Sequence, residues 1–348
     1  KKVFEAYLDN SSIFMTGPAG TGKSYLIKKI VCDATIRRKS IQCCALTGCA
    51  AILLDCNAKT LHSWSGVGVL NKSDDEIIHS LCLKKHKHKT WKDTDILIID
   101  EISMMNARLF SLLNRIGKII RRKNEPFGGI QIILSGDFYQ LPPITGKFCF
   151  ESPDWEDCIH KSVLMKTIFR QNEPIFTKIL NQIRKGRISR KTYNILNECV
   201  KKDKSELKEI SPTIILPKKH QTELINQEHL EKLETPSVVF EATIQNENNG
   251  NNSKFLEYEI KNMYHSNMFV KCLTVKVGAQ VMCIANLDME NEICNGSVGK
   301  ILKISTDGVL IQFKHCTRWI TRNIWASDSI TGLSISQLPL ILAWSCTI

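Results

Sequence analysis

No apolar run in this 348-residue sequence is long enough to cross a lipid bilayer, which needs about 20 such residues. Its first residues lack the pattern of a secretory signal peptide. None of its 14 cysteines forms a C-x-x-C pair, so nothing indicates a zinc ribbon or a dithiol redox motif. We therefore expect no membrane partner and an intracellular, reducing environment. The nucleus, the mitochondrion and the cytoplasm of a virus-infected cell all remain open.

Acidic residues are the minority among the charged side chains. Lys and Arg total 47 against 35 Asp and Glu, which gives a formal net charge of +12. Because Lys and Arg neutralise phosphates and release counterions, a nucleic-acid partner is one explanation. A solvated basic surface is the other, and charge alone does not decide between them. With 43% hydrophobic and 24% charged residues, the chain has a globular composition, and its length allows two or more domains.

The N-terminal part alternates short apolar runs with helical patterns. Strands are predicted at 12–17, 41–48, 96–101 and 130–137. This alternation predicts right-handed crossovers and a parallel sheet, and strands that are apolar throughout fit a sheet covered on both faces. After residue 274, closely spaced short strands with Gly turns predict a small antiparallel barrel or sandwich.

A phosphate-binding loop follows the first predicted strand. Glycines in such a loop let backbone N–H groups turn toward phosphate oxygens, and the following helix N-terminus adds a positive dipole end. Lys23 is placed to reach the β- and γ-phosphates of ATP, and the Ser24 hydroxyl is a ligand for Mg²⁺. The motif G-x-x-x-x-G-K-[ST] is matched by Gly17, Pro18, Ala19, Gly20, Thr21, Gly22, Lys23 and Ser24.

Two carboxylates end the third predicted strand. Asp100 and Glu101 follow the run ILII, and successive residues at a strand end splay apart, so the two can serve different atoms. We expect Asp100 to hold Mg²⁺ and Glu101 to orient and deprotonate the attacking water. A helix N-cap aspartate followed by a first-turn glutamate is the structural alternative, but the upstream phosphate loop favours the functional reading.

The fourth predicted strand ends in the loop SGDFYQLPP (135–143). Ligands of open α/β sheets bind at such strand ends. We expect Gln140 to hydrogen-bond the γ-phosphate or the attacking water, and Asp137 to connect the loop with the magnesium shell. Phe138 and Tyr139 could belong to the core or to an interface.

Together these segments resemble the motifs of Pif1-like helicases, a branch of helicase superfamily 1 related more distantly to RecD-type enzymes. The order and spacing match from about Ser11 to Gln171 and again at VGAQVMCIANLD, NGSVGKI and LPLILAWSCTI. The N-terminal segments are GPAGTGKS, LTGCAA, TLHSWSG, IIDEISMM, FGGIQIILSGDFYQLPPI and FRQ. The resemblance implies an ATP-dependent DNA helicase that moves 5′ to 3′ on single-stranded DNA. It also implies unwinding of duplexes, forks or G-quadruplexes in replication, repair, recombination or telomere maintenance.

The resemblance further implies an α/β fold of two RecA-like P-loop domains with parallel sheets. We expect domain 1A over residues 1–150, with a small 1B insert at about 65–92. Domain 2A is expected over 151–268 and 336–348, and an SH3-like β insert, domain 2B, over 269–335. The implied motor is monomeric and acts on single-stranded DNA and on junctions of single-stranded and duplex DNA.

Several site residues follow from the same resemblance. Arg170 in FRQ resembles the arginine that reaches the γ-phosphate from the second domain and stabilises transition-state charge. Independently of the resemblance, a motor on single strands needs stacking groups and a basic groove, and Trp64 is an expected DNA contact, with packing in the core as the alternative. A basic region is expected to follow DNA phosphates and comprises Arg184, Lys185, Arg187, Arg190 and Lys191. The motifs expected to contact the strand contain Thr47, Gly48, Thr60, His62 and Ser63.

Three family motifs fall outside the printed sequence. The family's adenine-reading glutamine would precede Lys1, and its H-K-S-Q-G motif and final arginine would follow Ile348. We therefore expect the natural protein to extend at both ends, and residues 1–348 could bind nucleotide without unwinding DNA. Three alternatives stay open: an RNA helicase on the same core, a nucleotide-gated clamp on single strands, and a small-molecule kinase, which Arg170 and the basic balance disfavour.

Overall fold

The computed structural model divides the chain into two compact units, Lys1–Lys201 and Lys202–Ile348. Each unit is described here by itself. The description covers residues 2–54, 56–68, 70, 72–83, 85–201, 211–247, 253–266, 269–285, 287–288, 293–327, 330 and 332–347. Within these residues, no helix combines the length and apolar character that a membrane span requires.

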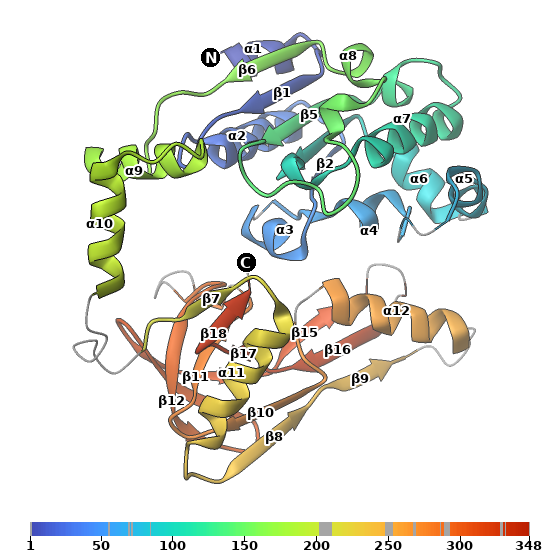
Figure 1. The fold of residues 1–348 in the computed structure, drawn as a ribbon. Coiled ribbons are helices and arrows are strands. Elements are labelled where there is room, and N and C mark those ends of the chain that lie inside the picture. The colour runs from blue at the N-terminus through green and yellow to red at the C-terminus, as the bar shows by residue number, and fades with distance from the viewer. Residues whose placement is uncertain are drawn as a thin grey trace. The chain divides into compact units, whose positions relative to one another are not determined.

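The first unit is built on a six-stranded sheet in the order β3-β2-β4-β5-β1-β6 (Figure 1). All neighbouring strands pair in parallel, as the alternating sequence pattern predicts. The carboxyl ends of the strands therefore meet at one edge, where the predicted motifs follow. The strands are β1 (Ile13–Thr16), β2 (Ile41–Ala45), β3 (Lys59–Thr60), β4 (Ile96–Asp100), β5 (Gln131–Gly136) and β6 (Lys161–Leu164).

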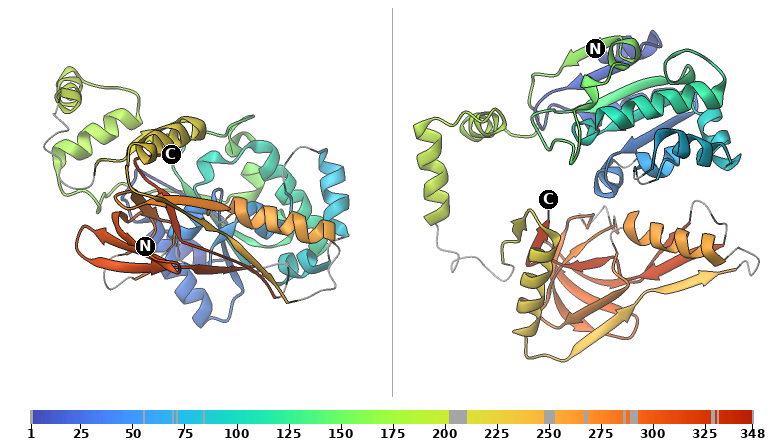
Figure 2. Two further views of the ribbon diagram at one scale, coloured as in Figure 1. Left: turned by 90° about the horizontal axis from the view of Figure 1, so that it is seen from below. Right: turned by 45° about the vertical axis from the view of Figure 1, so that its right-hand side comes forward.

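Helices cover both faces of this sheet (Figures 1 and 2). Successive strand residues point to opposite faces. Ile98 therefore packs with Ile27 and Ile30 of α2 (Lys23–Ile36), whereas Leu97 and Ile99 pack in the cluster that contains α7 (Ala107–Arg121). Each fully buried aliphatic side chain stabilises the fold by about 1.5–3 kcal/mol. The two cores explain why the strands are apolar throughout.

The remaining helices of the first unit are short. The residues expected to form the small 1B insert, 65–92, include α5 and most of α6, whose Leu81 and Trp91 are buried in the same core cluster as α7. The bounds are α1 (Lys2–Leu8), α3 (Gly48–Leu54), α4 (Leu61–Ser65), α5 (Asp74–Cys82), α6 (Lys85–Asp93), α8 (Trp155–Cys158), α9 (Pro174–Arg184) and α10 (Arg190–Lys201), with 3-10 turns at Ile102–Met104, Pro126–Gly128 and Cys149–Glu151.

The first unit extends beyond the boundary predicted at residue 150. β6 pairs in parallel with β1, and Met165 donates its backbone N–H to the carbonyl of Thr16 at 2.7 Å. The unit then continues through α9 and α10 to Lys201. The segment that carries Arg170 therefore lies in the first compact unit, and the domain bounds implied by the family resemblance stay predictions.

The second unit is mostly antiparallel. β14-β13-β12-β11-β17 form one sheet, β15-β16-β9 and β10-β8 form two others, and β18 pairs in parallel with β7. The predicted antiparallel strands after residue 274 are present, and the SH3-like description of the 269–335 segment stays a prediction. The strands are β7 (Ile214–Leu216), β8 (Ser237–Glu241), β9 (Thr243–Asn246), β10 (Cys272–Lys276), β11 (Gln280–Cys283), β12 (Val298–Ile304), β13 (Gly308–Phe313), β14 (Thr317–Thr321), β15 (Asn323–Ala326), β16 (Leu333–Gln337), β17 (Leu340–Leu342) and β18 (Ser345–Thr347), and the helices are α11 (Lys219–Glu231) and α12 (Ser253–Ser266).

Candidate nucleotide-binding site

The predicted phosphate loop connects β1 to the N-terminus of α2. Gly20 and Gly22 have φ angles of +80° and +85°, in the left-handed region that glycine adopts without steric cost. The Thr21 hydroxyl donates a hydrogen bond to the carbonyl of Pro18 at 2.9 Å, which closes the turn. A chain reversal of this kind directly before a 14-residue helix is suited to anion binding by backbone N–H groups.

The Lys23 ammonium is held by the backbone of the phosphate loop and is subject to the charges of three acidic side chains. Its ammonium donates to the carbonyl of Gly17 at 2.8 Å and to that of Pro18 at 3.1 Å. Burial lowers its pKa, and the charges of Asp137, Asp100 and Glu101 oppose that shift. The structure thus brings together residues from β1–α2, β4 and β5 that are far apart in the sequence.

Glu101 has an unusual backbone at the end of β4. Its φ of +55° and ψ of +40° are left-handed, which is uncommon for a residue other than glycine. Burial, followed by the neighbouring charge of Asp100, raises the pKa of Glu101. Asp100 is only 8% exposed. Local strain and a raised carboxyl pKa beside a phosphate loop are typical of a catalytic position.

Asp137 organises the loop after β5. It is 1% exposed, and its carboxylate accepts hydrogen bonds from the Tyr139 backbone at 3.2 Å and the Gln140 side chain at 3.3 Å. Gln140 is exposed and lines a cavity of about 220 Å³ together with Pro18 and Ala19 of the phosphate loop. The two motifs therefore border one space, as their positions at adjacent strand ends predict.

The FRQ segment runs along the phosphate loop. Phe169 donates its backbone N–H to the carbonyl of Gly20 at 2.8 Å. A Cβ placed on Gly20 would lie 2.7 Å from Cβ of Arg170 and 2.8 Å from Oε1 of Gln171. Arg170 is exposed and follows directly after this contact. It therefore lies next to the loop that is expected to bind the ATP phosphates.

The expected magnesium ligands lie at the same edge of the sheet. Ser24 occupies the first turn of α2, and Asp100 ends β4. A hydroxyl and a buried carboxylate are oxygen ligands of the kind that Mg²⁺ accepts beside phosphate oxygens. No cluster of three or more His, Cys, Asp or Glu side chains that could hold a metal by itself occurs among the described residues. These residues fit a metal held jointly with a nucleotide.

The predicted DNA-contacting residues other than Trp64 lie after β2 and β3. Thr47 follows β2, and its hydroxyl accepts from the Ala50 backbone at 3.2 Å at the start of α3, next to Gly48. Thr60 caps α4 by accepting from the Ser63 backbone at 3.2 Å. Burial lowers the pKa of His62, so the imidazole is neutral at pH 7. The DNA-binding role of these side chains stays a prediction.

Trp64 is a core residue, which corrects its assignment as a DNA contact. It is 1% exposed, and its ring packs against that of Trp91 with centroids 4.5 Å apart. A ring covered on all sides cannot stack on a base. The segment pattern did not reveal this because Trp91 lies 27 residues further along the chain, on another helix.

Arg184 also differs from its prediction. Its guanidinium donates two hydrogen bonds to the Asp137 carboxylate, both at 2.6 Å, so it does not follow DNA phosphates. The other four residues of the predicted basic region are exposed, and their DNA role stays a prediction: Lys185, Arg187, Arg190 and Lys191. The Arg184–Asp137 pair has no sequence signal, since 47 residues separate its members.

Comparison with known proteins decides the family. A family model described as PIF1-like helicase matches residues 1–194, more than half of the chain, and a second, described as DNA helicase Pif1, 2B domain, matches residues 259–304. The chain belongs to the PIF1-like helicase family. The Pif1 motifs quoted from the sequence and the α/β fold with its parallel sheet are thereby confirmed.

Curated Pif1-family relatives match over most of this chain. The ATP-dependent DNA helicase RRM3 of Saccharomyces cerevisiae is 35% identical over 88% of this chain and 42% of its own length. The ATP-dependent DNA helicase PIF1 of Danio rerio is 35% identical over 99% of this chain and 53% of its own length. The chain therefore spans about half the length of these relatives.

Solved Pif1 structures share the fold. Pif1 helicase from Candida albicans has a TM-score of 0.79 at 30% identity, with 99% of this chain and 84% of that chain covered. Bacteroides sp. Pif1 in complex with ADP-AlF4 has a TM-score of 0.76 at 26% identity, covering 99% and 81%. The second structure was solved with a bound nucleotide analogue.

Proposed function

We propose that this chain carries the ATP-hydrolysing motor of a DNA helicase. The observation that supports this most is the convergence of Asp100, Glu101 and Asp137 on the ammonium of Lys23, beside a glycine-rich turn at a helix N-terminus. A lysine that is partly desolvated and surrounded by carboxylates is suited to a ligand that brings both negative charge and a cation. ATP with Mg²⁺ has that charge pattern.

Each residue has a distinct task in this proposal. The backbone from Gly17 to Ser24 cradles the phosphates, and Lys23 contacts the β- and γ-phosphates. Glu101, whose pKa is raised toward neutrality, accepts a proton from the attacking water. Gln140 orients that water, and Arg170 stabilises the charge that develops on the transferred phosphoryl group.

Ser24 and Asp100 would hold Mg²⁺. The ion supplies electrostatic stabilisation to phosphate oxygens when it is bound. The buried position of Asp100 at the end of β4, next to Glu101, is consistent with that task.

The proposed partner is single-stranded DNA, including its junctions with duplex DNA. A related Pif1 from Bacteroides was solved bound to single-stranded DNA, and another related Pif1 structure concerns DNA unwinding at forked duplex DNA. The net charge of +12 supports a polyanionic partner. By family resemblance we also propose 5′-to-3′ translocation, G-quadruplex unwinding, a monomeric motor and a task in genome replication, repair, recombination or telomere maintenance.

A hydrolysis and strand-displacement experiment tests this function. ATP turnover of the complete natural protein is measured without nucleic acid, with single-stranded DNA and with RNA of the same sequence. Lys23→Ala is the inactive control, and Lys39→Ala, at the opposite edge of the sheet, is the matched lysine control. Stimulation by DNA together with displacement of a duplex strand supports the proposal. Stimulation by RNA alone identifies an RNA helicase, and ATP-dependent DNA affinity without displacement identifies a clamp.

A further inference from the structure

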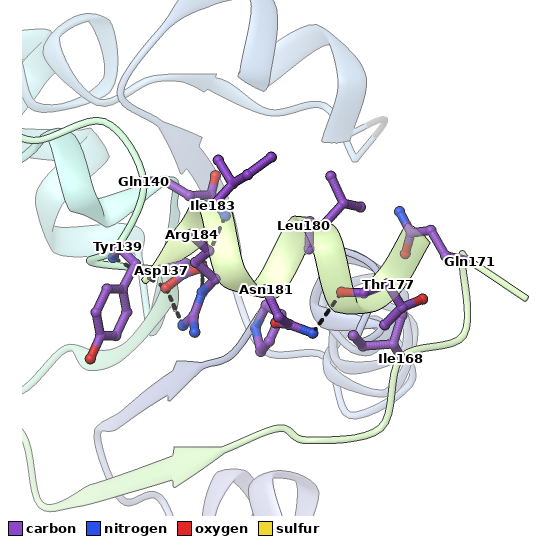
Figure 3. A pocket seen from close by; sticks show the side chains of 12 residues that line it. Asp137, Tyr139, Gln140, Ile168, Gln171, Thr177, Leu180, Asn181, Ile183 and Arg184 are labelled. Atoms are coloured by element: carbon purple, nitrogen blue, oxygen red, sulfur yellow. Dashed lines mark hydrogen bonds and ion pairs between the residues drawn. The ribbon is translucent and has the colours of Figure 1, made fainter. Parts of the chain in front are cut away.

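Arg184 is the last residue of α9, and its guanidinium forms an ion pair with the carboxylate of Asp137, the first residue after β5 (Figure 3). Nε donates to one carboxylate oxygen and Nη2 to the other, each at 2.6 Å. The side chain of Arg184 is 16% exposed and that of Asp137 is 1% exposed. A two-pronged, largely buried pair of this kind defines the orientation of both groups, which a single contact does not.

The same carboxylate holds the rest of the loop. It accepts from the backbone N–H of Tyr139 and from the side-chain amide of Gln140, and the Arg184 guanidinium lies over the Tyr139 ring at 4.4 Å from its centroid. Arg184 thus contacts two loop residues directly and a third through Asp137. Figure 3 shows these side chains between the end of β5 and α9.

The cluster faces the phosphate loop. Asp137, Gln140 and Arg184 line the same cavity as Pro18 and Ala19. The charges of Asp137 and Arg184 both act on Lys23, in opposite directions. Although burial alone would raise the pKa of Asp137, the hydrogen bonds and the charge of Arg184 lower it, so the carboxylate is ionised and can hold the amide of Gln140.

Stability alone is a weak reason for such a pair. Two charges removed from water lose much of their hydration, and buried ion pairs often contribute little net stability compared with apolar side chains. What such a pair does provide is a single defined orientation of its two side chains and of the groups bonded to them. Here the arrangement that they select is that of Gln140 beside the phosphate loop.

We propose that Arg184 is a positioning residue for ATP hydrolysis. It fixes Asp137 and through it Gln140, so that the position of α9 determines whether the Gln140 amide is aligned with the attacking water. This inference rests on the proposed ATPase function. It assigns to α9 a task within the hydrolysis site that is separate from DNA contact.

Two substitutions and one control separate this task from a structural one. Arg184→Lys keeps a positive charge near Asp137 but not the two-pronged geometry, and Arg184→Gln removes the charge. Lys178→Gln changes an exposed lysine on the same helix, α9, that is not part of the proposed site. For each complete protein, kcat with saturating single-stranded DNA, the Kd for ATP and the urea midpoint of unfolding are measured.

We expect kcat to fall about 10- to 100-fold in both Arg184 variants, which is typical of a misplaced catalytic group, with the Kd for ATP changed less than about threefold. We expect Arg184→Lys to recover stability but not kcat, and Lys178→Gln to resemble the wild type. An unchanged kcat in Arg184→Gln overturns the inference, as does recovery of kcat by Arg184→Lys or an equal loss of ATP affinity. If the wild-type protein does not hydrolyse ATP, the proposed function itself fails, and the inference fails with it.

Discussion

The backbone N–H of Phe169 donates to the carbonyl oxygen of Gly20 at 2.8 Å, so the FRQ segment is attached directly to the phosphate loop. Met165 adds a second attachment to Thr16 at the end of β1. The arginine expected to contact the γ-phosphate therefore follows a segment that pairs with the loop itself. Changes on either side of this contact should affect hydrolysis.

Gly20→Ala should disrupt this contact. The new Cβ would lie 2.7 Å from Cβ of Arg170, and the φ of +80° is unfavourable for alanine by about 1–2 kcal/mol. We expect ATP affinity to fall about tenfold or more, as measured by titration with a fluorescent ATP analogue. Gly68→Ala has a similar φ of +65° but no described atom within 4 Å of the added Cβ, so it should change affinity less than about twofold. Equal effects would contradict the crowding argument.

Glu101→Gln should retain ATP binding and remove turnover. The amide keeps the size of the side chain but cannot accept a proton from water, so we expect kcat to fall at least about 100-fold. In the wild type, burial and Asp100 raise the pKa of Glu101. The carboxylate is therefore lost at a higher pH than in an ordinary glutamate, and kcat should decline earlier as the pH is lowered. Loss of ATP binding in Glu101→Gln would show that the residue is structural.

Arg170→Ala should slow hydrolysis by about 10³-fold or more while the fold remains intact. Arg170 is exposed, so its removal leaves no cavity in the core. Turnover under saturating ATP and the urea midpoint of unfolding check the two parts of this prediction. A reduction of less than about fivefold would mean that Arg170 does not stabilise the transferred phosphoryl group.

Substitutions at Trp64 test its place in the core. Trp64→Ala should destabilise the protein by about 3–5 kcal/mol, because it removes a fully buried ring that packs on Trp91. Trp64→Phe keeps part of that packing and should leave the affinity for single-stranded DNA within about twofold of the wild type in fluorescence anisotropy. A stable Trp64→Phe protein with a tenfold loss of DNA affinity would restore the DNA-contact interpretation.

The sequence predicted those parts of the site that lie within continuous motifs. Asp100 ends a strand, Gly17–Ser24 and Gln140 come after the ends of two others, and parallel strands bring their carboxyl ends to one edge. It did not predict the burial of Trp64 or the pairing of Arg184 with Asp137. Both depend on which helix packs beside which strand end, and neither a hydrophobic period nor a short motif encodes contacts between residues 27 or 47 positions apart.

The extent of the first unit illustrates the same limit. The family resemblance implied that domain 1A spans residues 1–150, and the structure adds Lys161–Leu164 to the same sheet as an edge strand beside β1. This strand is mostly exposed and short, so its sequence, KSVL, carries little hydrophobic signal. Its place follows from tertiary pairing with β1.

The most direct test of the central claim is steady-state ATP hydrolysis with and without single-stranded DNA, measured on residues 1–348 and on the complete natural protein, with Glu101→Gln as the control in both. The account predicts strong stimulation by DNA in the complete protein and its loss in Glu101→Gln. Absence of stimulation by DNA in both forms, or turnover that survives Glu101→Gln, would contradict a DNA-coupled motor built on this site.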